Sequence, residues 1–292
     1  MQLLKRSFIL LLIAFTAYAA VSAFFAWRLT SPAHRIVGAV PADFPSTTQT
    51  VNFLALDGIK LSGWFVPCDN ATVAVVLLHG NGVSRRQVMA RVGLFHDAGY
   101  AVLLYDARGH GLSEGDKVSA GWFETADLLG ALDFVRTKGL HKFGCLGISQ
   151  GAATIALAAE KLPPEVAWVI LESSYPNMRD ALDRRFRNYL HLPGWLAGGL
   201  FMPFAEWRLG VAIDDIAPIK HIQNLPCPVF ILGGTHDQHT LLESTRALFN
   251  AAKAPKELWL VAGATHVDLY GFAQQEYARR ILAFAAGASA RP

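Results

Sequence analysis

A five-residue motif in the middle of the chain restricts the fold more than any other feature. Residues 147–151 read Gly-Ile-Ser-Gln-Gly, after an apolar run at 143–146 and before an alanine-rich stretch at 152–161. The apolar run predicts a strand and the alanine-rich stretch predicts a helix. A serine in a sharp strand-to-helix turn is exposed at the end of its strand, and small neighbours let the chain pass close to itself. We interpret Ser149 as a nucleophile; the alternative is a serine that only caps the helix.

Two later segments supply the partners that a serine nucleophile requires. A hydroxyl is a weak nucleophile until a base takes its proton, and an acid must orient that base. The apolar runs 228–232 and 258–261 each predict a buried strand, and each leads into a loop of small residues. Asp237 lies in the first loop and His266 in the second. The order serine, acid, histidine is the one that this kind of strand-to-helix turn requires.

A fourth motif lies upstream of the serine. Residues 73–78 are apolar and predict a central parallel strand, and His-Gly-Asn-Gly follows at 79–82. A loop in this place can offer a backbone N–H to a developing oxyanion. The second N–H comes from the residue after the nucleophile, which is Gln150.

With these motifs the chain resembles the α/β-hydrolases over roughly residues 48–285. The matching segments are HGNG at 79–82, YDARGHGLSEG at 105–115, GISQG at 147–151, GGTHD at 233–237 and GATH at 263–266. It is most similar to bacterial membrane-tethered or secreted serine hydrolases related to acylglycerol lipases and serine aminopeptidases. The resemblance implies Ser149 as nucleophile, Asp237 as acid, His266 as base, and the backbone amides of Asn81 and Gln150 as oxyanion donors. The chain differs from many relatives in the residues after the acid, where Gln-His-Thr at 238–240 replaces an apolar or Val-Pro pair.

Other side chains near these motifs are alternative candidates for the acid or for a metal site. Asp106 follows the strand predicted at 101–105 and could replace the acid, but we expect it to brace the loop at 108–111. Glu172 follows the strand predicted at 166–171 and is the second choice after Asp237. His236 and His239 flank Asp237, but no further set of ligands accompanies them, so we expect neither a metal nor a cofactor.

Strands that alternate with helices predict an α/β fold with a mostly parallel, doubly wound sheet and functional groups at the carboxyl ends of its strands. A hairpin around Asp57-Gly58 predicts an antiparallel edge at 51–67. Residues from about 173 to 220 interrupt the alternation with large apolar and basic side chains, and they predict a helical cap within a domain at 48–290. The cap aromatics could line an acyl pocket, touch a bilayer or simply pack on the core.

The first thirty residues differ in character from the rest. Lys5 and Arg6 precede a nearly uncharged run at 7–27, about 21 residues or roughly 30 Å as a helix, which predicts one transmembrane anchor. A cleaved signal peptide and a secreted enzyme are the alternative, because Ala-Tyr-Ala at 17–19 resembles a cleavage site. The flanking charges favour a hydrolase domain outside the cytoplasm. Prolines at 32, 41 and 45 predict a linker at 31–47.

Composition excludes several classes of function. The net charge is only +3, and no dense basic stripe is present, which argues against nucleic acid as a partner. Of three cysteines, Cys145 and Cys227 fall in or beside predicted core strands and read as small buried side chains.

These patterns predict a serine hydrolase that cleaves a carboxylic ester or thioester with an apolar acyl group. A peptidase of the aminopeptidase type is one alternative, and an inactive protein that binds an apolar ligand is another. The sequence leaves the oligomeric state open.

Overall fold

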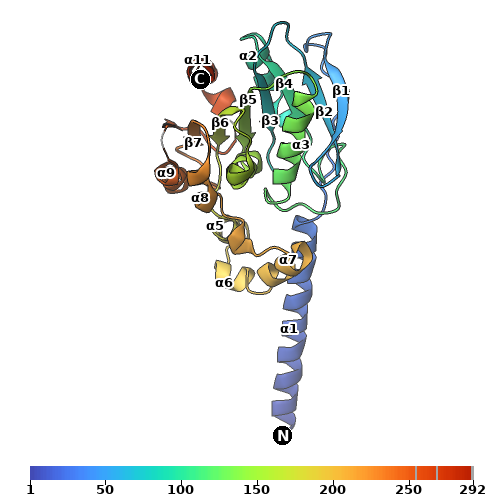
Figure 1. The fold of residues 1–292 in the computed structure, drawn as a ribbon. Helices are drawn as coiled ribbons and strands as arrows, with labels where there is room; N and C mark the ends of the chain where they lie inside the picture. Colours follow the sequence, from blue (N-terminus) through green and yellow to red (C-terminus); the bar gives the residue numbers. More distant parts are fainter. Residues whose placement is uncertain (254, 268, 291–292) are drawn as a thin grey trace.

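The computed structural model describes residues 1–253, 255–267 and 269–290. A long N-terminal helix, α1 (Gln2–Leu29), projects from a domain built on one sheet (Figure 1). The strands are β1 (Gln49–Leu54), β2 (Lys60–Val66), β3 (Ala74–Leu78), β4 (Ala101–Tyr105), β5 (Phe143–Ile148), β6 (Val166–Glu172), β7 (Val229–Gly234) and β8 (Lys256–Val261). They form an eight-stranded sheet in the order β1-β2-β4-β3-β5-β6-β7-β8. The pairs β1–β2 and β2–β4 are antiparallel and the other five pairs are parallel, so the predicted edge hairpin and mostly parallel sheet are confirmed.

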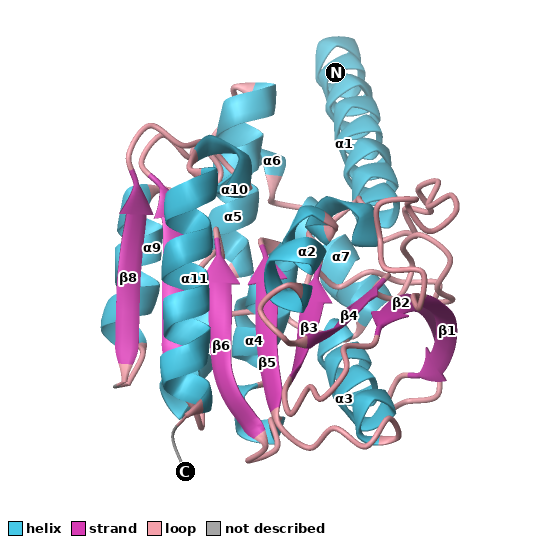
Figure 2. Ribbon diagram, turned by 90° about the horizontal axis from the view of Figure 1, so that it is seen from above, coloured by secondary structure: helices cyan, strands magenta, loops and turns pink. Residues whose placement is uncertain are grey.

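Helices cover both faces of the sheet, as Figure 2 shows from above. One face carries α3 (Glu124–Arg136), α4 (Gln150–Leu157) and α9 (Leu242–Ala251), and the other carries α2 (Ala90–His96) and α11 (Gln274–Ser289). In β3, Ala74, Val76 and Leu78 pack on the first face while Val75 and Leu77 pack on the second. Because both faces are buried, the strand is apolar at every position rather than at alternate ones. The sheet and its covering helices are connected in part by three short helices, η1 (Arg85–Val88), η2 (Ala159–Lys161) and α10 (Leu269–Phe272).

Two stretches with apolar residues at helical spacing, 84–99 and 119–138, form helices that are shorter than this spacing predicts. The helical pattern at 84–99 is divided between η1 and α2. The pattern at 119–138 becomes helical only at Glu124, whose carboxylate accepts hydrogen bonds from the amide and hydroxyl of Ser119 and from the amide of Gly121. These bonds hold the preceding residues in a loop, because they satisfy the amides without a helical turn.

The predicted helical insertion lies between β6 and β7, at the carboxyl end of the sheet. It contains α5 (Met178–Arg185), the π-helix η3 (Phe186–Leu190), α6 (Gly194–Ala197), α7 (Phe201–Leu209), η4 (Ile213–Asp215), α8 (Pro218–His221) and η5 (Ile222–Asn224). We call residues 178–221 the cap. Its buried apolar side chains form a cluster with Ala153 and Leu157 of α4, with Tyr175 and with Ala26 of α1.

The chain between α1 and the sheet follows the surface of the domain. The amide of Ala33 donates to the carbonyl oxygen of Gly109 over 2.7 Å, and Nδ1 of His34 donates to that of Gly111 over 3.0 Å. Nε of Arg35 donates to the carbonyl oxygen of Gly82 over 3.0 Å. The first part of the segment predicted as a linker is therefore bound to the loops at the carboxyl end of the sheet.

Candidate active site

Ser149 occupies a strained turn between β5 and α4. Its backbone has φ 53° and ψ −110°, a conformation that costs a residue other than glycine about 1–3 kcal/mol. A Cβ atom at Gly147 would lie 2.3 Å from the carbonyl carbon of Gly151, and one at Gly151 would lie 2.5 Å from the carbonyl oxygen of Leu78. Both positions therefore require glycine. The amide of Ser149 donates to the carbonyl oxygen of Glu172 over 2.8 Å, which fixes the turn against β6.

The three side chains predicted from the sequence meet at this turn. Nε2 of His266 lies 3.2 Å from Oγ of Ser149, and Nδ1 of His266 lies 2.7 Å from Oδ2 of Asp237. Asp237 and His266 follow β7 and β8, whose carboxyl ends lie at the same edge of the sheet as that of β5. Asp237 is fully buried as a side chain, whereas the imidazole is partly open to the cavity described below.

The unusual turn after Asp237 holds its carboxylate. Oδ1 accepts hydrogen bonds from the amides of His239 and Thr240, each over 2.8 Å. The hydroxyl of Thr240 donates to the carbonyl oxygen of Ser173 over 3.2 Å and so ties the turn to the end of β6. One carboxylate oxygen is thus held by the backbone, which leaves the other for His266.

His239 connects His266 to the cap. Its ring lies edge-on to that of His266 with centroids 5.1 Å apart, and Tyr189 stacks on its other side at 5.8 Å. Nδ2 of Asn188 donates to the carbonyl oxygen of Gln238 over 3.1 Å. Burial and the neighbouring His266 lower the pKa of His239, so it is neutral at pH 7. No sequence pattern indicates this contact, because Tyr189 belongs to a cap helix 50 positions away from His239.

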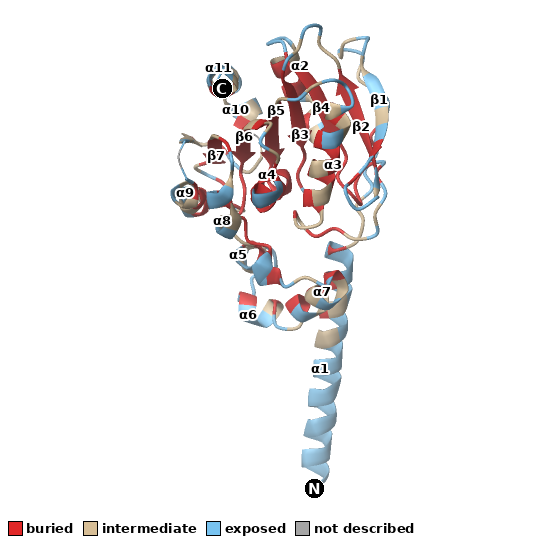
Figure 3. Cartoon of the chain, in the orientation of Figure 1, coloured by how far each residue is buried: buried red, intermediate tan, exposed pale blue. Residues whose placement is uncertain are grey.

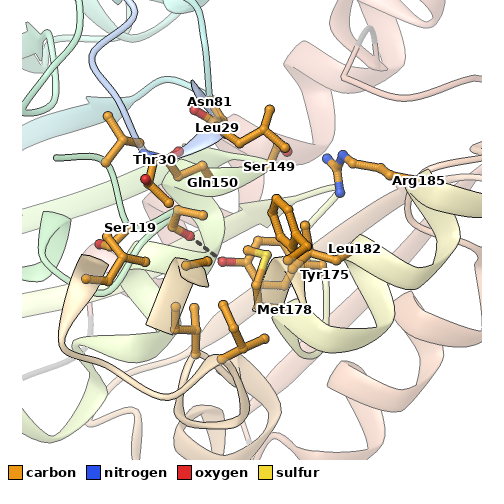
Figure 4. Close-up of a pocket in the computed structure, with 17 residues that line it drawn as sticks. Leu29, Thr30, Asn81, Ser119, Ser149, Gln150, Tyr175, Met178, Leu182 and Arg185 are labelled. Atoms are coloured by element: carbon orange, nitrogen blue, oxygen red, sulfur yellow. Dashed lines mark hydrogen bonds between the residues drawn. The ribbon is translucent and has the colours of Figure 1, made fainter. Parts of the chain in front are cut away.

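The two residues whose backbone amides are predicted as oxyanion donors lie beside the same cavity. Asn81 and Gln150 both line the cavity with Ser149 (Figure 4). Among the described residues, no acceptor receives a hydrogen bond from either amide. Gln150 also begins α4, whose N-terminal end favours negative charge.

A pair of buried histidines holds the loop that carries Asn81. Nε2 of His79 accepts from the amide of Ala107, and Nε2 of His110 accepts from the amide of Gly82, each over 3.0 Å. Burial, with a smaller effect of His110, lowers the pKa of His79 to about 4. Burial likewise lowers the pKa of His110. Both rings are neutral at pH 7 and can act as acceptors.

The two alternative acids are engaged elsewhere. Asp106 accepts from the amide and the guanidinium of Arg85, each over 2.7 Å, and from the amide of Leu112. It braces the glycine-rich loop, as expected. The carboxylate of Glu172 is paired with Arg91 at 2.8 Å and with the hydroxyl of Tyr277, on the α2 and α11 side of the sheet. Glu172 therefore does not contact His266.

A largely apolar cavity of about 110 Å³ opens beside Ser149, beneath the cap. Figure 4 shows its lining side chains, which come from distant parts of the chain. Met178 and Leu182 belong to α5, and Leu29 belongs to α1. Arg185 is the one charged side chain among the lining residues. Within the described ranges, no group of three or more His, Cys, Asp or Glu side chains is arranged to hold a metal ion.

Comparison with known proteins places these features in context. A family model described as alpha/beta hydrolase fold matches residues 73–218, half of the chain. The uncharacterized protein YfhR of Escherichia coli K12 is 26% identical over 278 residues, which cover 91% of this chain and 88% of YfhR. The human alpha/beta hydrolase domain-containing protein 17B is 26% identical, with 78% of this chain and 71% of that protein covered.

Solved structures show the same fold at lower identity. The esterase PF2001 of Pyrococcus furiosus superimposes with a TM-score of 0.73 and 23% identity, over 88% of this chain and 97% of the esterase. Est1E of Butyrivibrio proteoclasticus, solved with ferulic acid bound, gives a TM-score of 0.62 at 18% identity, over 82% and 99% of the two chains.

Proposed function

Because this chain belongs to the family of proteins with the α/β hydrolase fold, we propose that it is a serine hydrolase that cleaves a carboxylic ester or thioester of an apolar acyl group. The observation that carries the proposal is the hydrogen-bonded series from Asp237 through His266 to Ser149, beside an apolar cavity. The esterase PF2001, which shares this fold, supports the same class of reaction.

In the proposed reaction, the arrangement of the three side chains sets the path of the proton. Nδ1 of His266 donates to Asp237, which leaves Nε2 free to accept the proton of Ser149 as its Oγ attacks the acyl carbonyl. The amides of Asn81 and Gln150 then hold the oxyanion, since they have no other acceptor among the described residues. His266 returns the proton to the leaving group, and water cleaves the acyl-enzyme by the same route in reverse.

The cavity favours an apolar acyl group over a peptide. The cap side chains that line it, among them Met178, Leu182 and Phe201, are apolar apart from Arg185, so they offer few partners for a peptide backbone. A helix that is long and apolar enough to cross a membrane adjoins this cavity, although a signal sequence would have the same composition. We propose that α1 anchors the enzyme in a membrane, with the hydrolase domain outside the cytoplasm.

The test is the variant Ser149→Ala. We expect it to lose all labelling by a fluorophosphonate probe and to lower the turnover of p-nitrophenyl butyrate by about six orders of magnitude. Ser173→Ala is the matched control, because Ser173 is also buried, also has positive φ, and its hydroxyl has no partner among the described residues. Labelling that survives in Ser149→Ala would exclude this nucleophile. Cleavage of aminoacyl-anilides without cleavage of the ester would favour a peptidase.

A further inference from the structure

We propose that α1 and the cap form one unit immersed in the lipid leaflet next to the domain, and that the last turn of α1 is a wall of the acyl pocket. The acyl chain of an ester dissolved in the bilayer then enters the pocket from the leaflet, without crossing water. This inference rests on the hydrolase function proposed above. It assigns to α1 a part in the site beyond that of an anchor.

The first observation is that α1 reaches the cavity of Ser149. Leu29 and Thr30 line it, opposite the α5 side chains Met178 and Leu182 (Figure 4). Thr30 is fixed there, because its hydroxyl accepts from Nε of Arg208 over 2.9 Å and its carbonyl oxygen accepts from the amide of Val118 over 2.9 Å. The end of α1 is thus held to both the cap and the domain.

The second observation is a continuous stripe of contact between α1 and the cap. Tyr18, Ser22, Ala26 and Thr30 follow each other at a spacing of four, which places them on one face of the helix. Ser22, Ala26 and Thr30 are buried, whereas most of α1 is exposed. The hydroxyl of Tyr18 donates to the carbonyl oxygen of Leu196 over 2.5 Å and accepts from the amide of Leu200 over 3.2 Å.

The contact extends too far along α1 for the cap to remain outside a membrane. From Tyr18 to Thr30 the helix rises by about 18 Å. A membrane core requires about 20 apolar residues of helix, and the charges of Lys5 and Arg6 mark where the apolar run begins. A span that starts at Ser7 ends near Trp27, so it contains most of the stripe. The cap segments that touch the stripe therefore lie at the depth of the leaflet.

The outer surface of the cap has the composition that this position requires. Trp195 is 78% exposed and Trp207 is 84% exposed. Further exposed apolar side chains on the cap are Tyr189, Leu190, Leu192 and Leu196. Figures 1 and 3 show α7 beside α1 and α6 next to α7, with part of α6 in the colour of exposed residues. Tryptophan is enriched where proteins meet the membrane interface. A patch of this kind, continuous with an apolar helix, fits a lipid leaflet as its partner.

The experiment uses the full chain reconstituted in phosphatidylcholine vesicles and compares two esters. One is p-nitrophenyl palmitate dissolved in the vesicles, and the other is p-nitrophenyl acetate in the buffer. Leu29→Phe enlarges the side chain in the pocket wall, whereas Leu10→Phe makes the same change on an exposed part of α1 far from the cap. A double variant, Trp195→Ser with Trp207→Ser, removes the two exposed aromatic side chains.

We expect Leu29→Phe to lower the ratio of the palmitate rate to the acetate rate about tenfold or more, since a misfit of this size in an apolar pocket has about this effect on a long acyl chain. Leu10→Phe should match the wild type with both esters. The double tryptophan variant should lose activity toward palmitate in vesicles and keep activity toward acetate.

Equal behaviour of Leu29→Phe and Leu10→Phe with palmitate would overturn the inference. Cleavage of acetate by the wild type without cleavage of vesicle-borne palmitate would also overturn it, since the substrate would then come from water. In both cases the proposed hydrolase function would stand. A wild type that cleaves neither ester and takes up no fluorophosphonate label would instead refute the proposed function itself.

Discussion

Oδ2 of Asp237 lies 2.7 Å from Nδ1 of His266, while the other oxygen of the same carboxylate is held by two backbone amides. The amides are those of His239 and Thr240, in the turn whose residues differ from the pattern that the family resemblance implies. The departure does not disturb the acid, because the backbone rather than the side chains of the turn makes the contact. The carboxylate can therefore fix the imidazole with its Nδ1 proton toward Asp237 and Nε2 toward Ser149.

Asp237→Asn is expected to lower kcat by about four orders of magnitude with little loss of stability. The amide is the same size as the carboxylate, but it can donate to Nδ1 and so favour the wrong tautomer of His266. Steady-state turnover of p-nitrophenyl butyrate measures the effect, and the thermal unfolding midpoint controls for folding. Full activity in Asp237→Asn would show that the acid lies elsewhere.

Glu172→Gln is expected to lower the stability of the domain and to leave kcat nearly unchanged, the reverse of Asp237→Asn. Glu172 forms a buried ion pair with Arg91, so loss of its charge leaves the guanidinium unpaired and lowers the free energy of unfolding by about 3–5 kcal/mol. The kcat of the folded molecules should stay near that of the wild type, because Glu172 does not contact His266. Urea unfolding and active-site titration separate the two quantities. A large fall in kcat at full stability would restore Glu172 as the acid.

The sequence predicts best those parts of the site that local chain geometry determines. Ser149 is recognisable because Gly147 and Gly151 must flank it, and Asp237 and His266 because each follows a strand that ends at the same edge of the sheet. Contacts between segments that are distant in the sequence cannot be predicted in this way. Nothing near Tyr189 in the sequence indicates that it stacks on His239.

The same limit applies to α1. Its apolar composition identifies a helix of membrane-spanning length but does not show which face is covered. The middle of the stripe, Ser22 and Ala26, consists of small residues in an otherwise apolar run, and only the cap that packs on it shows that this face is covered. Only the folded structure reveals that Leu29, which precedes the last residue of this stripe, reaches the cavity.

Gly151→Ala is expected to abolish fluorophosphonate labelling and to destabilise the domain by about 1–3 kcal/mol. The added Cβ atom would meet the carbonyl oxygen of Leu78 at 2.5 Å, and backbone atoms cannot move away without displacing β3. Gly287→Ala in α11 is the matched control, since nothing lies within 4 Å of its Cβ position. That change should stabilise the helix by up to about 1 kcal/mol and leave labelling intact. Normal labelling in Gly151→Ala would mean that the turn between β5 and α4 accommodates the added Cβ atom.

His79 is expected to make the stability of the domain depend on pH between about 6.5 and 4. Burial lowers the pKa of His79 to about 4, and its Nε2 must stay unprotonated to accept from the amide of Ala107. A histidine in the unfolded chain has a pKa near 6.5. Above pH 6.5 the ring is neutral in both states, so its contribution to stability is fully present. As the pH falls toward 4, the unfolded chain binds a proton that the folded domain does not.

The stabilisation from His79 should therefore decrease by about 3 kcal/mol from pH 7 to pH 4, and it should change little below that. Urea unfolding in detergent micelles at several pH values, with His79→Gln as the reference that cannot titrate, isolates this contribution from that of the carboxylates. The difference in unfolding free energy between the wild type and the variant should shrink as the pH falls. A difference that stays constant would mean that the imidazole at this position binds a proton as readily in the folded domain as in the unfolded chain, so that the loop carrying Asn81 is not held by a neutral acceptor.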